Sequence, residues 1–172
     1  QIGHSALRTW AMGEAAFERA ANEDELRAME QQLDAALKAG AIGFSTSLSA
    51  HHETADDRPV ASRLAPWSEV RRLVLGMRRA GGGIFELAKE PDTQADDPVL
   101  RRAACERMRS LAVDSAIPMT FGLVATGNTH DVWREQLGLL EDTVRAGGRM
   151  AGQCHSRGIT VLLSFQTALP FD

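Results

Sequence analysis

Hydroxyl and imidazole side chains follow directly after a short apolar run in the first third of the sequence. The run leads into Ser45, Thr46 and Ser47, and two adjacent histidines, His51 and His52, come next. Hydroxyls donate and accept hydrogen bonds, and an imidazole exchanges a proton near neutral pH, so this set has the chemistry of a substrate-binding wall. A solvated loop has the same composition, and the sequence leaves both interpretations open. Neighbours in an extended segment point to opposite sides, so the paired histidines are weak evidence for a metal site.

A second group of reactive side chains occupies residues 153–157, where Cys154, His155 and Arg157 stand close together. The imidazole of His155 can bind a metal ion or act as a general acid or base. The guanidinium of Arg157 can bind a carboxylate through two parallel hydrogen bonds. A histidine at the end of a strand is also often a hydrogen-bonded structural residue, and that alternative stays open.

One carboxylate, Glu86, interrupts the apolar run Ile84–Ala88. Burying an ionised carboxylate costs several kcal/mol unless the group is paired, protonated or bound to a metal ion. The sequence therefore predicts either a functional role for Glu86 or a structural ion pair.

Alternating helices and strands would position these side chains. Asn22 and Glu25 form a capping box, and leucines and methionines then repeat at helical spacing up to Gly40. The apolar run Ala41–Leu48 has the length of a buried strand. The pattern recurs as a helix starting near Pro66 or Ser68 and ending at Gly81, the strand Ile84–Ala88, a helix capped by Asp97 with Pro98 at its first position, the strand Ile117–Val124, a helix from about His130 to Gly147, and the strands Met150–Cys154 and Thr160–Phe165.

This alternation predicts right-handed βαβ units and a mostly parallel sheet. An open doubly wound sheet and a (β/α)8 barrel both fit, and a barrel needs about 250 residues. The chain has 172 residues, begins at Gln1 without a methionine and ends just after an apolar run, which favours about half of a barrel. We expect residues 1–172 to be an internal segment of a catalytic barrel with about four βα units. In either fold, ligands bind at the carboxyl ends of the strands.

Composition excludes several classes of protein. The net charge of −4 provides no basic stripe for nucleic acid. No window reaches the roughly 18 to 20 apolar residues of a membrane span, and no signal peptide opens the chain. Cys105 and Cys154 form no metal-binding or disulfide pattern. We therefore expect a cytoplasmic, soluble protein with reduced thiols, and the motifs GxGxxG, GxxxxGK[ST], HExxH and GxSxG are absent.

Three segments in order, Gly3–Arg8, Met12–Gly13 and Ala39–Leu48, carry a resemblance to a known family. They read GHSALR, MG and AGAIGFSTSL. In this order they resemble the N-acyl-D-amino-acid deacylases, or D-aminoacylases, of the amidohydrolase superfamily (amidohydrolase family 3). The segments DxRPV at 56–60 and QxH at 153–155 extend the likeness over the whole chain.

The resemblance implies a metal-dependent (β/α)8 barrel that hydrolyses the amide of an N-acyl-D-amino acid with zinc-activated water. Where the family has zinc-ligand histidines, this chain reads Glu86-Leu87-Ala88-Lys89 and Thr120-Phe121-Gly122-Leu123. The family's HxH pair and catalytic aspartate would lie outside these residues. Glu86 and His155 are the nearest candidate metal ligands, and Ser45, Thr46, His51, His52 and Arg157 are the candidate substrate-binding residues.

Two further functions remain open at this stage. A catalytically silent barrel segment would act as a binding or oligomerisation module. A small doubly wound ligand-binding domain would fold by itself. For the deacylase we expect a small N-acyl amino acid or related amide as substrate, no nucleic-acid or membrane partner, and the rest of the barrel or a homo-oligomer as protein partner.

Overall fold

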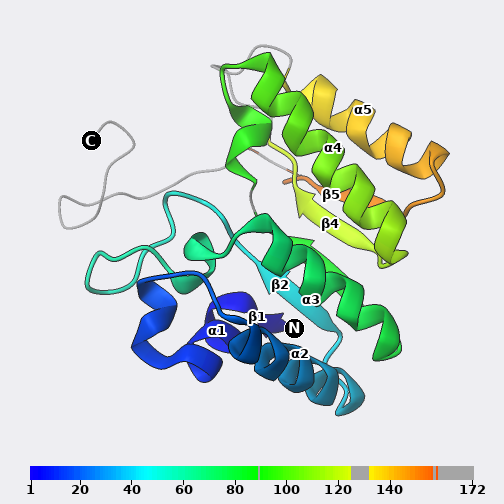
Figure 1. Cartoon of the computed structure of the whole chain (residues 1–172). Coiled ribbons are helices and arrows are strands. Elements are labelled where there is room, and N and C mark those ends of the chain that lie inside the picture. The colour runs from blue at the N-terminus through cyan, green and yellow to red at the C-terminus, as the bar shows by residue number, and fades with distance from the viewer. Residues whose placement is uncertain (89, 125–131, 157, 159–172) are drawn as a thin grey trace.

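The computed structural model describes residues 1–88, 90–124, 132–156 and 158 (Figure 1). Within these ranges the chain forms a parallel sheet with helices between successive strands. The strands are β1 (Ile2–Gly3), β2 (Gly43–Thr46), β3 (Ile84–Leu87), β4 (Met119–Gly122) and β5 (Met150–Gln153). The helices are α1 (His4–Met12), α2 (Glu23–Lys38), α3 (Trp67–Arg79), α4 (Pro98–Ser115) and α5 (Val132–Arg145), with short 3-10 helices η1 (Gly13–Phe17), η2 (Ala61–Leu64) and η3 (Pro91–Gln94).

The helix starts agree with the signals in the sequence. Asn22 accepts a hydrogen bond from the Glu25 N–H while the Glu25 carboxylate accepts one from the Asn22 N–H, which is the predicted capping box of α2. The Asp97 side chain accepts from the Val99 N–H and Pro98 takes the first position of α4, as predicted. These contacts satisfy amides that the first turn of a helix leaves unpaired.

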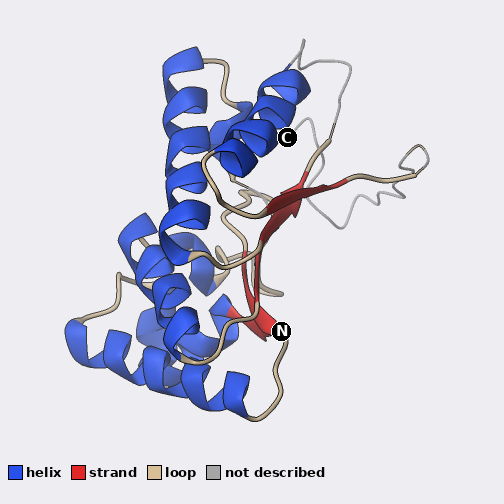
Figure 2. Cartoon of the chain, turned by 90° about the vertical axis from the view of Figure 1, so that its right-hand side faces the viewer, coloured by secondary structure: helices blue, strands red, loops and turns tan. Residues whose placement is uncertain are grey.

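The order of the strands identifies the architecture. The sheet runs β1-β2-β3-β4-β5, and each strand is parallel to its neighbours. All the helices lie on one face of the sheet, as Figure 2 shows. In a doubly wound sheet the strand order reverses at a switch point and helices cover both faces. The alternative prediction of a small doubly wound domain was therefore wrong. In a (β/α)8 barrel each new strand joins the same edge of the sheet, so the order of the strands follows the order of the chain. This chain has that order and forms part of such a barrel.

The hydrophobic core lies between this sheet and its helices. Phe44, Phe85 and Phe121 alternate along their strands with residues of the opposite face and are fully or almost fully buried. The rings of Phe44 and Phe85 stack with their centroids 5.7 Å apart. Apolar residues of α2, α3 and α4 cover them: Met29, Leu33, Leu37, Val70, Leu73, Met77, Met108 and Leu111.

Two elements, β1 and α1, were not predicted from the pattern of the sequence. β1 has only two residues, which is too short to show an alternation. Gly3 caps α1 without a side-chain hydrogen bond, and the first turn contains no acidic residue, so the usual start signals are missing. The predicted strand Thr160–Phe165 and the predicted helix start at His130 lie outside the described residues. In the part that is described, no helix is both long and apolar enough to cross a membrane.

Candidate functional site

A row of polar side chains crosses the sheet on the face that carries no helices. Ser45 of β2 pairs in register with Glu86 of β3, and Glu86 pairs with Thr120 of β4. Their chain neighbours Phe44 and Phe85 are buried on the opposite, helix-covered face. Because successive residues of a strand alternate between faces, the three polar residues share the open face, which is the inside of a barrel.

A cavity of about 510 Å³ lies at the carboxyl ends of β2 and β3. Strand ends, the start of α1 and the loop after β2 form its wall. Ser45, Thr46, His51, His52 and Glu86, which the sequence proposes for substrate or metal, all line it. The other lining residues are Gly3, His4, Ser5, Ala6, Ser47, Glu53, Val60, Ser62 and Ala88. The structure thus brings together five of the seven residues singled out in the sequence.

The hydroxyl of Thr46 faces the helices. Thr46 is buried, and its Oγ1 lies 2.8 Å from Nδ1 of His4. The Thr46 side chain thus anchors the end of β2, although the residue still borders the cavity. Ser45, one position earlier, presents the hydroxyl on the open face.

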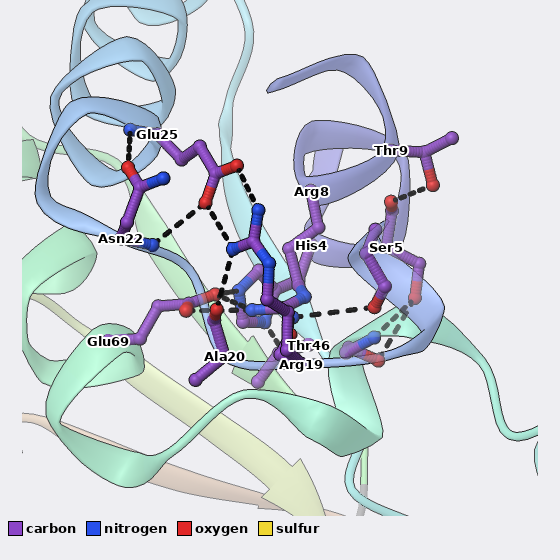
Figure 3. A network of polar contacts seen from close by, with 12 residues as sticks. His4, Ser5, Arg8, Thr9, Arg19, Ala20, Asn22, Glu25, Thr46 and Glu69 are labelled. Atoms are coloured by element: carbon purple, nitrogen blue, oxygen red, sulfur yellow. Dashed lines mark hydrogen bonds and ion pairs between the residues drawn. The ribbon is translucent and has the colours of Figure 1, made fainter. Parts of the chain in front are cut away.

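A buried polar network holds α1 against the start of α3 (Figure 3). Nε2 of His4 lies 2.9 Å from Oε1 of Glu69, and Nη1 of Arg8 donates to both oxygens of the same carboxylate at 2.6 and 2.7 Å. Nη2 of Arg8 donates to the carbonyl oxygen of Arg19 at 2.7 Å. The side chains of His4, Arg8 and Glu69 are no more than 1% exposed. The network fixes the segment that leads from β1 into the cavity wall.

Burial and pairing set the protonation states in this network. Burial lowers the pKa of His4 more strongly than the hydrogen bond to Glu69 raises it, so the ring stays neutral. Burial alone would raise the pKa of Glu69, but the hydrogen bonds from His4 and Arg8 outweigh it and lower that pKa. Neutral His4 therefore donates through Nε2 to an ionised Glu69 and accepts at Nδ1 from Thr46.

The loop after β2 carries the two histidines into solvent at the mouth of the cavity. Nδ1 of His52 lies 2.7 Å from Oγ of Ser47. Ser62 anchors this loop: its hydroxyl donates to the Ser47 carbonyl oxygen at 2.8 Å and its N–H donates to Oγ of Ser5 at 3.1 Å. His51 is exposed as well. The loop after β2 is thus tied to both the strand end and α1.

Glu86 is half-buried rather than enclosed in the core. Its place on the open face gives it access to the cavity, and no hydrogen bond or ion pair involves its side chain within the described ranges. A buried carboxylate besides that of Glu69 belongs to Glu90, whose Oε1 lies 2.5 Å from Nη2 of Arg107. Burial raises the pKa of Glu90 despite the charge of Arg107.

The candidate metal ligands do not gather into one group. His155 is exposed beyond β5 and is not among the residues that line the cavity. No group of three or more histidine, cysteine, aspartate or glutamate side chains is placed to hold a metal ion in the portion of the chain that is described. Arg157 lies outside the described residues.

The sequence reasoning missed the contributions of His4 and Glu69, and the contact of Ser47 with His52. His4 belongs to the GHSALR segment, but nothing in the local pattern showed its partner 65 positions away. Glu69 stands in the first turn of α3, where an acidic residue is usual because it complements the helix dipole. Only the tertiary fold distinguishes this residue from an ordinary exposed one.

A second cavity, of about 560 Å³, lies between α4 and α5 on the outer side of the sheet. Its wall includes Arg102, Cys105 and Glu106. All its lining residues belong to these two helices and none to a strand end, where barrels of this type bind their ligands, so the cavity at β2 and β3 is the candidate site.

Comparisons with known proteins agree with this architecture. No family model and no curated protein matches the chain. Among solved structures, D-aminoacylase, described as defining a novel subset of amidohydrolases, matches 90% of this chain and 29% of its own, with a TM-score of 0.66 and 22% identity. The N-acyl-D-glutamate deacylase from Bordetella bronchiseptica, complexed with zinc and a phosphonate mimic of the tetrahedral intermediate, matches 87% of this chain and 28% of its own, with a TM-score of 0.66 and 20% identity.

The chain thus spans less than a third of the length of these two proteins. Its fold is similar to the corresponding part of the D-aminoacylase barrel, as the segments Gly3–Arg8 and Ala39–Leu48 implied.

Proposed function

We propose that the protein containing this chain is an amidohydrolase that removes the acyl group from an N-acyl-D-amino acid, and that residues 1–172 are an internal segment of its catalytic barrel. One observation carries the proposal: Ser45, Glu86 and His52 come from separate segments and meet at the carboxyl ends of parallel strands. That is the face at which (β/α)8 enzymes bind substrate. The similarity in fold to two deacylases supports the same function.

The residues of this chain bind and orient the substrate. The hydroxyl of Ser45 and the imidazoles of His51 and His52 donate hydrogen bonds to the amide and carboxylate oxygens of an N-acyl amino acid. Glu86, facing the inside of the barrel, accepts hydrogen bonds from a substrate N–H or assists a metal ion. Arg157 remains the predicted partner of the substrate carboxylate.

Zinc is the cofactor that the resemblance implies, and it would activate water for attack on the amide. The described residues do not fit a complete zinc site, since no three ligand side chains gather among them. Catalytic zinc usually has three protein ligands. We therefore propose that the residues of this chain bind the substrate. Glu86 and His155 remain individual candidates for zinc ligands in the whole barrel.

The test uses the full-length protein that contains this chain. Release of the free amino acid from N-acetyl-D-amino acids is measured against the L enantiomers, and bound zinc is measured by elemental analysis. Hydrolysis of the D substrates with about one or more zinc ions per chain is expected. The double variant His51→Ala/His52→Ala should raise KM and keep its zinc, whereas Glu86→Ala or His155→Ala should reduce the zinc content.

A catalytically silent barrel is the second candidate. Glu86-Leu87-Ala88 stands where the resembled family has a zinc-ligand histidine, and this difference favours it. A folded full-length protein without zinc and without hydrolysis of any N-acyl amino acid would support the silent barrel and contradict the deacylase.

A further inference from the structure

The contact between Ser47 and His52 is short, and its direction depends on the tautomer of the imidazole. Oγ of Ser47 lies 2.7 Å from Nδ1 of His52 and accepts the N–H of Ser49 at 3.3 Å. A serine hydroxyl has a single proton. Within the described residues, Nδ1 of His52 is the acceptor in reach of that proton. If Ser47 donates that proton to Nδ1, neutral His52 has its own proton on Nε2.

Backbone hydrogen bonds hold His52 at this position. Its N–H donates to the carbonyl oxygen of Ser49 at 3.1 Å. Its carbonyl oxygen accepts from the N–H of Val60 and from Nη1 of Arg63, both at 3.3 Å. The backbone of His52 is thus fixed from both sides, and the hydrogen bond from Ser47 fixes the ring.

The Nε2 atom of His52 makes no hydrogen bond to any residue in the described part of the chain, and His52 lines the cavity at the strand ends. A ring held in one tautomer with a free N–H is a directed hydrogen-bond donor. The donor suits an oxygen that carries lone pairs, such as an amide carbonyl or a carboxylate. Both groups occur in an N-acyl amino acid.

We propose that Ser47 is a positioning residue that locks His52 in the Nε2–H tautomer, so that His52 donates to an oxygen of the substrate. The binding role rests on the proposed function, whereas the tautomer is a property of the protein alone. Ser47 lines the cavity as well, and its proposed role here is to act through His52.

The first experiment reads the tautomer without any substrate. The full-length protein is labelled with ¹⁵N-histidine and studied by NMR at about pH 8.5, where imidazoles are generally neutral. The His52 signals are assigned by their loss in His52→Asn. We expect Nδ1 to resonate as an unprotonated nitrogen and Nε2 as a protonated one. Ser47→Ala should move both signals towards a mixture of tautomers, and Ser47→Thr, which keeps the hydroxyl, should restore the wild-type pattern.

A protonated Nδ1 in the wild-type protein, or signals unchanged in Ser47→Ala, would overturn the tautomer assignment. Failure to find hydrolysis would overturn the proposed function and leave this spectroscopic result standing. The two failures are therefore distinguishable.

Kinetics test the binding role. His52→Gln keeps an N–H near the position of Nε2, whereas His52→Asn keeps only a group near Nδ1. We expect His52→Asn and Ser47→Ala to raise KM about tenfold with kcat little changed, since one uniform binding contact is worth about 1.4 kcal/mol. His52→Gln should recover much of the loss. Equal KM values for His52→Asn and wild type would overturn the role.

The oxygen that His52 binds is identified with a second substrate. The N-acetyl amine that has a hydrogen atom in place of the carboxylate lacks both carboxylate oxygens but keeps the acyl carbonyl. If the KM effect of His52→Asn disappears with this N-acetyl amine, His52 binds the carboxylate. If the effect persists, His52 binds the acyl oxygen.

Discussion

Nε2 of His4 lies 2.9 Å from Oε1 of Glu69, and this contact joins the first residue of α1 to the first turn of α3. The same carboxylate takes two hydrogen bonds from Arg8. Because His4 also contacts Thr46 at the end of β2, one carboxylate connects two helices with the strand that forms the cavity wall.

Removing the carboxylate of Glu69 should destabilise the protein strongly. Glu69→Ala leaves the guanidinium of Arg8 buried and without its counter-charge, and breaking a buried ion pair from one side costs about 3–5 kcal/mol. Urea unfolding measures the loss. The matched control is Glu141→Ala, which removes an exposed partner of Arg145 and should cost less than about 1 kcal/mol. Equal effects of the two variants would show that the buried network adds no stability.

His4 should make the protein sensitive to mild acid. Its pKa is lowered from 6.5 in the folded state, so the unfolded chain binds a proton more readily. This contribution to stability is complete above about pH 6.5 and is lost as the pH falls through that value toward the lower folded pKa. His4→Gln should remove it, so the variant should lose less stability than wild type between about pH 7.5 and 5.5. If the free energies of unfolding of wild type and His4→Gln, measured with urea, fell in parallel over this pH range, the prediction would be contradicted.

The sequence predicted the starts of helices well wherever the signals were local. Asn22, Asp97 and Pro98 gave helix starts that the structure confirms, because a cap depends on residues two or three positions away. The alternation of helices and strands fits both a barrel and a doubly wound sheet, since the choice depends on which strands pair; the sequence favoured part of a barrel, and the strand order confirms it. β1 was missed because two residues carry no periodic pattern.

The cap of α2 should contribute measurable stability. Asn22→Ala removes the acceptor for the Glu25 N–H and should cost about 1 kcal/mol of unfolding free energy. Hydrogen bonds from Arg19 and from the Asn22 N–H lower the pKa of Glu25 to about 2, so the carboxylate side of the box stays ionised down to strongly acidic pH. Gln32→Ala, in an exposed position of the same helix, is the control and should change stability by less than about 0.5 kcal/mol.

Gly43 should not tolerate a side chain. A Cβ at this position would lie 1.9 Å from the carbonyl oxygen of Ile84 in the neighbouring strand, and backbone cannot move aside cheaply. Gly43→Ala should cost about 3 kcal/mol or more, or prevent folding. Gly138→Ala in α5 is the matched control, because a Cβ there meets nothing within 4 Å. The control should stabilise the protein by about 0.5–1 kcal/mol through better helix propensity.

The candidate site was predictable only in part. Ser45 and Glu86 follow from the rule that ligands bind at the ends of parallel strands, and the register confirms that they lie side by side. The half-buried state of Glu86 was not predictable, because an open-face position cannot be told from a core position within a short apolar run. Ser47 was named with Ser45 and Thr46 as part of a pocket wall, but its contact with His52 was not predictable, because that contact depends on the path of the loop.

The hydrogen bonds of Ser62 to Ser47 and Ser5 bear on how this protein would meet a ligand. A segment fastened at both ends loses its conformational entropy when the chain folds, so little remains to be lost on association. Binding should then proceed as a rigid fit, with an affinity undiminished by ordering of the loop after β2. Free and occupied forms of residues 47–62 should superpose closely.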